Sequence, residues 1–118
     1  MSKKRLLTGL QSSGDLHIGN YFGALKQWQE LQNKYNSIFL VVDLHALTVN
    51  QVSSELRNRC LSYVAQYVAC GINPEKSKIV IQSHVHQHAE LMWILSSLTY
   101  LGELNRMTQF KDKSKISK

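Results

Sequence analysis

The chain has 118 residues, of which 43% are hydrophobic, and its formal net charge is +6. This length fits one domain with a modest core, and a content of one proline and six glycines excludes a collagen-like or low-complexity chain. The apolar run at residues 38–42 is far shorter than a membrane span, so we expect no contact with a membrane.

The positive charge lies at the two ends of the chain. Lys3, Lys4 and Arg5 are near its start, residues 111–118 contain four lysines, and the segment between holds as many acidic as basic residues. Basic ends can contact phosphates, but short charged ends are also typical of solvated tails, so charge does not decide the function. The first charges resemble the start of a signal peptide, yet no apolar segment follows them, and we expect a cytoplasmic protein.

The first part of the chain predicts a strand, a helix and a second strand. Residues 5–10 are a short apolar run before turn formers at residues 11–15, and residues 38–42 are apolar throughout, as in a buried strand. A helix is expected between them, from about residue 17 to residue 33 or 36. Its buried face comprises Tyr21, Leu25, Trp28 and Leu31.

A second helix is expected in the middle of the chain. Ser53 or Ser54 can cap it, and Gly71 and Pro74 end it. Its predicted buried stripe comprises Leu56, Cys60, Tyr63, Val64, Tyr67 and Val68.

A strand at residues 78–81 and a helix at about residues 87–104 complete the expected elements. The spine of this last helix comprises Leu91, Ile94, Leu98 and Leu101. The tail from Lys111 is expected to be frayed or to lack its packing partner. The order β-α-β-α-β-α predicts an α/β architecture with a parallel sheet.

Four cysteine and tryptophan residues have simple structural interpretations. Cys60 and Cys70 lie ten residues apart in one expected helix, about 15 Å along its axis, which is too far for a disulfide. Two buried, reduced thiols are expected instead. Trp28 and Trp93 lie on helical stripes, so we expect both in the core.

Two groups of polar residues suggest chemistry only weakly. His84, His86 and His88 would face one side of an extended segment, as zinc ligands can, but no cysteine stands close by and we expect no metal site. Asp43 and His45 could form an acid/base pair, although residues two apart at a strand end are more typical of a structural role.

The most informative stretch is TGLQSSGDLHIGN at residues 8–20, which combines a strand end, a polar turn and the start of a helix. Ligands of parallel α/β sheets bind at the carboxyl ends of the strands, and the start of a helix favours an anion such as a phosphate. Gly14 and Gly19 would let a ligand approach the backbone, and His17 and Asn20 can point toward one anion. Alternatively, the glycines serve a tight turn and Asn20 caps the helix.

Four motifs carry a family resemblance. HIGN at residues 17–20 resembles the signature of class I aminoacyl-tRNA synthetases, in the variant that ends with Asn. GLQSSG at residues 9–14 resembles the Gly-x-Gln-Pro-Ser-Gly of tryptophanyl-tRNA synthetases, with Ser12 where proline is usual. VDLHALT at residues 42–48 and GELNRMTQFK at residues 102–111 agree with the same family.

The resemblance implies a Rossmann-like fold and a tryptophan–tRNA ligase activity. Residues 1–118 would form the N-terminal portion of a nucleotide-binding catalytic domain, its first half, without an anticodon-binding domain. The tryptophan carboxylate would attack the α-phosphorus of ATP, and the activated acyl group would pass to tRNA(Trp). The implied ligands are ATP with Mg²⁺, L-tryptophan and tRNA(Trp), and the implied assembly is a homodimer. In such a dimer Leu91, Trp93 and Leu98 would face the partner subunit instead of the core, and periodicity does not separate these two cases. We expect the isolated chain to have weak or no activity.

The resemblance also implies roles for single residues. His17 and Asn20 would be catalytic, with His17 donating to the phosphates in the transition state. The ATP-binding residues would be Gln11, Ser12, Ser13, Gly19 and Asn20. The tryptophan-binding residues would be Leu7, Gly9, Val42 and His45.

Other interpretations stay open. Tyrosine-specific sister enzymes share the architecture, and a related nucleotidyltransferase would explain residues 17–20 but not the downstream motifs. A non-catalytic synthetase-like module would instead bind RNA through the basic ends, or a metal through the three alternating histidines.

Overall fold

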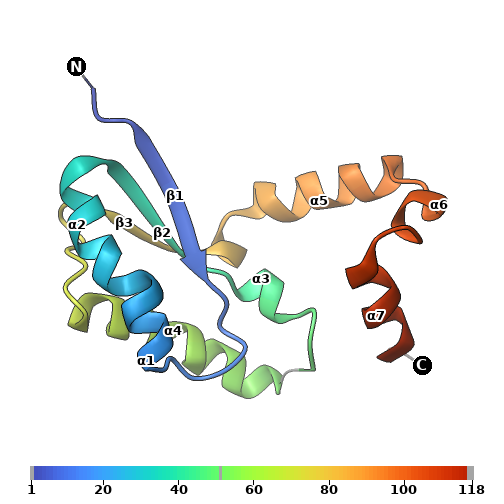
Figure 1. Cartoon of the computed structure of the whole chain (residues 1–118), viewed down its shortest axis with the longest axis horizontal. Helices are drawn as coiled ribbons and strands as arrows, with labels where there is room; N and C mark the ends of the chain where they lie inside the picture. The colour runs from blue at the N-terminus through green and yellow to red at the C-terminus, as the bar shows by residue number, and fades with distance from the viewer. Residues whose placement is uncertain (1, 51, 117–118) are drawn as a thin grey trace. The chain divides into compact units, whose positions relative to one another are not determined.

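The computed structural model describes residues 2–50 and 52–116 of the chain. It consists of two compact units, Met1–Val85 and His86–Lys118. The first unit contains a β-sheet with helices, and the second is built from helices (Figure 1).

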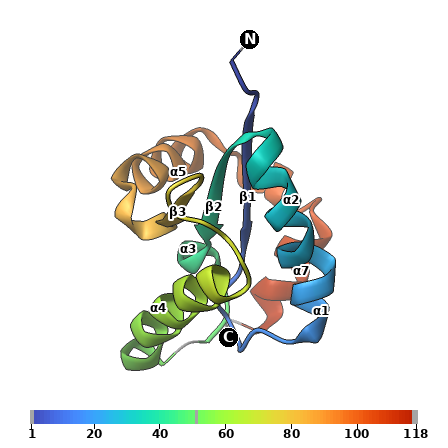
Figure 2. The same cartoon turned by 90° about the vertical axis from the view of Figure 1, so that its left-hand side faces the viewer.

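The sheet has three parallel strands, β1 (Arg5–Leu10), β2 (Asn36–Val41) and β3 (Lys78–Ile81). Strand β2 lies between the other two (Figure 2), and its Phe39 and Val41 are fully buried. The parallel pairing confirms the predicted α/β architecture. The second strand begins two residues earlier and ends one residue earlier than the apolar run suggested, because pairing with β1 extends to polar residues at its start.

The helical segment after β1 has three parts: α1 (Ile18–Asn20), the π-helix η1 (Tyr21–Leu25) and α2 (Lys26–Lys34). The helix predicted from residue 17 is confirmed, but its second turn is widened. Hydrophobic spacing does not reveal such a π turn, since the buried positions still lie on one side. π turns inside α-helices are frequent near functional sites.

Helix α4 (Ser53–Ala69) follows the short helix α3 (Asp43–Ala46). The predicted serine cap is wrong: the N-cap is Val52, which has no side-chain capping bond, and Ser53 is already helical. The predicted end is confirmed by Gly71, whose φ of 90° favours glycine. Val68 is 45% exposed and leaves the predicted stripe, because it lies on the solvent side of the last turn.

The core lies where α2 and α4 pack on one face of the sheet. Trp28 of α2 stacks on Phe39 with ring centroids 4.7 Å apart and meets Tyr67 of α4 edge-on at 5.3 Å. Both cysteines are free thiols, as predicted. Cys60 is buried in this core, whereas Cys70 is only half-buried because it ends α4.

The second unit contains α5 (His86–Leu98), α6 (Leu101–Leu104) and α7 (Thr108–Ile116). The single helix predicted for residues 87–104 is interrupted after Leu98. Of the two positions expected for Trp93, the core is excluded within this unit, since its side chain is 74% exposed, and the dimer-facing one stays a prediction. The spine residues are also more than half exposed: Leu91, Ile94, Leu98 and Leu101. A helix with apolar residues on every side needs more covering surface than these short helices supply.

The C-terminal segment also differs from its expectation. The tail from Lys111, expected to be frayed, is helical up to Ile116; Lys118 lies outside the described residues. Within residues 2–50 and 52–116, no helix combines the length and apolarity needed to cross a bilayer.

Candidate active site

The candidate site lies at the carboxyl edge of the sheet, where the chain leaves β1 and β2. Gln11 directly follows β1, and its side-chain amide donates to the backbone oxygen of His45 in α3 at 3.5 Å. The segments after the two strands therefore meet. Gln11, expected in the ATP pocket, and His45, expected in the tryptophan pocket, thus lie side by side.

The entrance of the first helix is held by a reciprocal pair of hydrogen bonds. The Nδ1 atom of His17, the N-cap, accepts from the Gly19 N–H at 3.1 Å. The Asn20 side-chain oxygen accepts from the His17 N–H at 3.0 Å. A Cβ on Gly19 would lie only 2.9 Å from His17 Cε1, so glycine lets the ring approach its own backbone donor. The alternative that Asn20 caps the helix is confirmed only in part: His17 is the N-cap, and Asn20 completes the capping box from three residues later.

The same contacts leave donors for a ligand. Because His17 Nδ1 accepts a hydrogen bond, the neutral ring carries its proton on Nε2. Asn20 accepts through its oxygen, so its side-chain nitrogen keeps two hydrogens to donate. His17 is exposed, and Asn20 is half-buried. Capping and anion binding thus use different atoms of the same two side chains.

The serines of the polar turn face opposite environments. Ser12 is completely buried, backbone included, with its Oγ 3.6 Å from Cys60 Sγ. Ser13 is exposed. Gly14 has open space around its Cα, so no packing contact requires glycine there.

The expected tryptophan-binding residues gather on the face of the sheet opposite α2 and α4. A Cβ on Gly9 would lie 2.6 Å from the Leu40 oxygen and 2.7 Å from Val42 Cγ2. Gly9 is therefore required for the close packing of β1 on β2. Leu7, two residues earlier in β1, points to the same face and is 59% exposed. His45 is exposed beyond the end of β2.

Helix α4 contributes contacts that sequence reasoning missed. The Tyr63 hydroxyl lies 2.7 Å from the backbone oxygen of Gly14 and 3.1 Å from that of Gln11, and its single hydrogen is shared between these two acceptors. Burial raises the pKa of Tyr63, partly offset by the positive charge of Arg59, so the hydroxyl stays protonated at neutral pH. The one available signal was that a buried tyrosine must find a hydrogen-bond acceptor.

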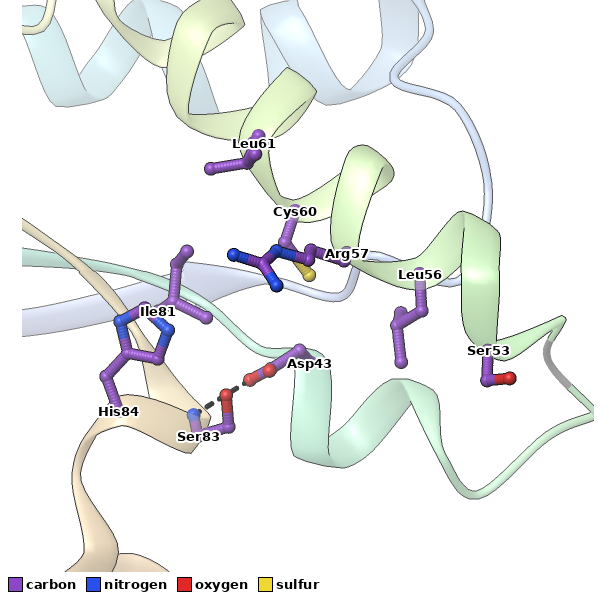
Figure 3. Close-up of a pocket in the computed structure, with 9 residues that line it drawn as sticks. All are labelled: Asp43, Ser53, Leu56, Arg57, Cys60, Leu61, Ile81, Ser83 and His84. Carbon is purple, nitrogen blue, oxygen red and sulfur yellow. Dashed lines mark hydrogen bonds between the residues drawn. The ribbon is translucent and has the colours of Figure 1, made fainter.

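Asp43 has a structural role. Its Oδ1 accepts from the backbone N–H groups of Leu44 at 3.1 Å and Ser83 at 3.0 Å, which ties the ends of β2 and β3 together (Figure 3). Asp43 also borders a cavity of about 440 Å³ on the α4 side of the sheet. The cavity is lined by Asp43, Ser53, Leu56, Arg57, Cys60, Leu61, Ile81, Ser83 and His84.

The alternating histidines are not in an extended segment. His84 ends the 3₁₀-helix η2 (Gln82–His84), while His86 and His88 belong to α5. In the described part of the chain, no three His, Cys, Asp or Glu side chains gather as a metal site would require.

Comparison with known proteins gives the family. Residues 2–118 match the family described as tRNA synthetases class I (W and Y). The tryptophan–tRNA ligase of Clostridium tetani is 59% identical over 113 residues, which cover 96% of this chain and 33% of that relative.

Solved structures agree. The tryptophanyl-tRNA synthetase of Campylobacter jejuni complexed with ADP and tryptophan has a TM-score of 0.82 and 45% identity, over 94% of this chain and 35% of that one. The tyrosyl-tRNA synthetase of Archaeoglobus fulgidus complexed with L-tyrosine shares the fold, with a TM-score of 0.71 at 22% identity, over 88% of this chain and 34% of that one. The chain thus spans about a third of the length of these relatives. It belongs to the class I tRNA synthetase family for tryptophan and tyrosine.

Proposed function

We propose that the protein containing this chain is a tryptophan–tRNA ligase and that residues 1–118 form the N-terminal portion of its catalytic domain. The observation that carries this proposal is the 59% identity over 113 residues with a tryptophan–tRNA ligase. Specificity for tryptophan rather than tyrosine is supported by 45% identity with a tryptophan enzyme against 22% with a tyrosine enzyme. In such an enzyme the tryptophan carboxylate attacks the α-phosphorus of ATP, which releases pyrophosphate, and tRNA(Trp) then receives the acyl group.

We assign the nucleotide to the edge formed by the segment from Gln11 to Asn20. His17 Nε2 donates to the phosphates and stabilises the charge that develops on them in the transition state. The Asn20 amide and the backbone near Gly19 lie at the same helix entrance, where the dipole favours an anion. Gln11 and Ser13 border the nucleotide, and the buried Ser12 supports the loop beneath them. These roles are supported by the free donor atoms at this entrance.

We propose that Mg²⁺ accompanies ATP as the cation of the nucleotide. No three metal-ligating side chains gather among the described residues. Mg²⁺ commonly keeps several waters and binds through the phosphates of its nucleotide. We therefore expect Mg²⁺ to enter with ATP.

We assign tryptophan to the sheet face that carries Leu7, Gly9 and Val42, next to His45. Because Gly9 has no side chain, Val42 packs directly against β1 on this face. The exposed Leu7 offers an apolar surface to the indole ring. Gln11 bonds to the backbone of His45, so the two substrates would meet where the two strands end.

We further propose that the protein is a cytoplasmic homodimer in which α5 contributes to the subunit interface. The support is the exposure of the large apolar side chains of α5, among them Trp93 at 74% and Leu98 at 70%. Contiguous apolar surface of this kind is typical of protein–protein interfaces.

The function is tested by tryptophan-dependent exchange of pyrophosphate with ATP. The 118-residue chain and the longest form of the protein that contains it are assayed in parallel, with tyrosine as the control substrate. We expect exchange with tryptophan only, and weak or no exchange by the 118-residue chain. Exchange with tyrosine would favour the sister enzyme, and no exchange by the longest form would contradict the proposal.

A further inference from the structure

Three neighbouring side chains of α4 hold the loop Gln11–Gly14. The Tyr63 hydroxyl, on a side chain only 3% exposed, bridges the backbone oxygens of the first and last loop residues at 3.1 and 2.7 Å. Arg59 donates to the Ser13 oxygen at 3.5 Å, and Cys60 Sγ lies 3.6 Å from Ser12 Oγ. We call Arg59, Cys60 and Tyr63 the α4 clamp. Every residue of the loop contacts one of its members.

Besides the α4 clamp, the loop is fixed by the burial of Ser12 and by the 3.5 Å hydrogen bond from the Gln11 side chain to the His45 oxygen. It lies between the end of β1 and the start of α1, and it contains Ser12, whose φ is less restricted than that of a proline. The Gly-x-Gln-Pro-Ser-Gly motif, which residues 9–14 resemble, has proline at that position. The Tyr63 hydroxyl limits the same freedom from outside the loop, because moving either end of the loop would break the hydrogen bond that its single hydrogen shares between two carbonyl oxygens.

We infer that Tyr63 is a positioning residue for the nucleotide: its hydroxyl fixes the loop Gln11–Gly14 in the conformation that receives ATP. The inference rests on the proposed function. Tyr63 is buried and does not touch the ligand, so it acts through the backbone of Gln11 and Gly14. Its removal should weaken the use of ATP much more than that of tryptophan, because Leu7 and Gly9 belong to the sheet and not to the loop.

The test compares Tyr63→Phe with Tyr67→Phe in the longest form of the protein that contains this chain. Both variants remove one hydroxyl from a buried tyrosine of α4, but Tyr67 donates to the Leu40 oxygen of β2 at 3.1 Å instead of to the loop. The KM values for ATP and tryptophan are measured by pyrophosphate exchange. We expect Tyr63→Phe to raise the KM for ATP about tenfold, as for a lost buried hydrogen bond, with the KM for tryptophan changed less than about threefold. Tyr67→Phe should leave both KM values within about twofold of wild type, a smaller change than one hydrogen bond would give. An unchanged KM for ATP in Tyr63→Phe, or equal changes in the two variants, would overturn the inference.

Two further measurements examine how Tyr63 acts. Amide hydrogen exchange at residues 11–16 needs neither ATP nor activity, and we expect it to be faster in Tyr63→Phe than in Tyr67→Phe. Adding Ser12→Pro to Tyr63→Phe should bring the KM for ATP back toward wild type, because proline restricts the loop without restoring the hydroxyl. Failure of this rescue would refute an action through loop rigidity. If wild type shows no tryptophan-dependent exchange, the proposed function fails, and unaltered hydrogen exchange in Tyr63→Phe would separately refute the positioning role.

Discussion

The capping role of His17 and its proposed role in catalysis can be separated by substituting asparagine. In His17→Asn, the side-chain oxygen can accept from the Gly19 N–H as Nδ1 does at 3.1 Å, and asparagine is among the best N-cap residues. The substitution removes the Nε2 donor because the asparagine side chain is too short to reach the same position. His17→Ala removes both the cap and the donor. Comparing His17→Asn with His17→Ala therefore separates the effect on stability from the effect on catalysis at one position.

The expected magnitudes differ for the two roles. Loss of one preorganised donor to developing charge lowers the rate of adenylate formation about 10²–10³-fold, so both variants should show this loss in pyrophosphate exchange. Loss of the N-cap costs about 1 kcal/mol in the free energy of unfolding, so only His17→Ala should unfold at lower urea concentration. A wild-type rate in His17→Asn would show that His17 is a cap and no more. Equal destabilisation of both variants would refute the capping argument.

Three further predictions concern packing, ionisation and assembly. Gly9→Ala should destabilise the fold by about 1–3 kcal/mol in urea unfolding, because its Cβ would lie 2.6 Å from the Leu40 oxygen. Gly14→Ala, where the Cβ would meet open space, should change the free energy of unfolding by less than about 1 kcal/mol, and similar effects of the two variants would contradict this prediction. Burial raises the pKa of Tyr67 above its ordinary value, so the Tyr67 hydroxyl loses its proton in the unfolded chain first, and the free energy of unfolding should fall as the pH rises above about 10. Tyr67→Phe should make this fall shallower, and an unchanged slope would contradict the prediction. Trp93→Glu should convert the proposed dimer of the longest form into monomers in sedimentation, and a persisting dimer would place the interface elsewhere.

Elements with their own local signal were predictable from the sequence. The first strand, the third strand and the end of α4 follow from apolar runs and from Gly71, and the structure has them where the pattern indicates. Trp28 was assigned correctly to the core because its helix packs on the sheet of the same unit. For Trp93 the same rule left a core position and a dimer-facing position open, and the side chain is exposed in the described part of the chain. Periodicity predicts which face of a helix is apolar but not whether a surface exists to cover it.

In the candidate site, too, contacts between residues close in sequence were predictable, whereas contacts between distant residues were not. His17, Gly19 and Asn20 are close in sequence, so their mutual geometry follows from the local start of a helix and from motif spacing alone. Tyr63 reaches the loop from about fifty residues away in the chain, and a stripe of apolar positions predicts that it is buried without indicating what its hydroxyl meets.

A tyrosine on a buried stripe nevertheless contains more information than a leucine would. Its hydroxyl costs free energy in a core unless an acceptor is present, and most strand and helix carbonyls already have one partner, although a carbonyl can accept a second bond, as the Leu40 oxygen does from Tyr67. The unpaired acceptors near a parallel sheet belong to the loops at its edge, which is also where ligands bind. Buried tyrosines on the helices of α/β proteins are therefore candidates for residues that position a ligand-binding loop, and Tyr63 contacts this edge while Tyr67, one turn further, bonds to the strand.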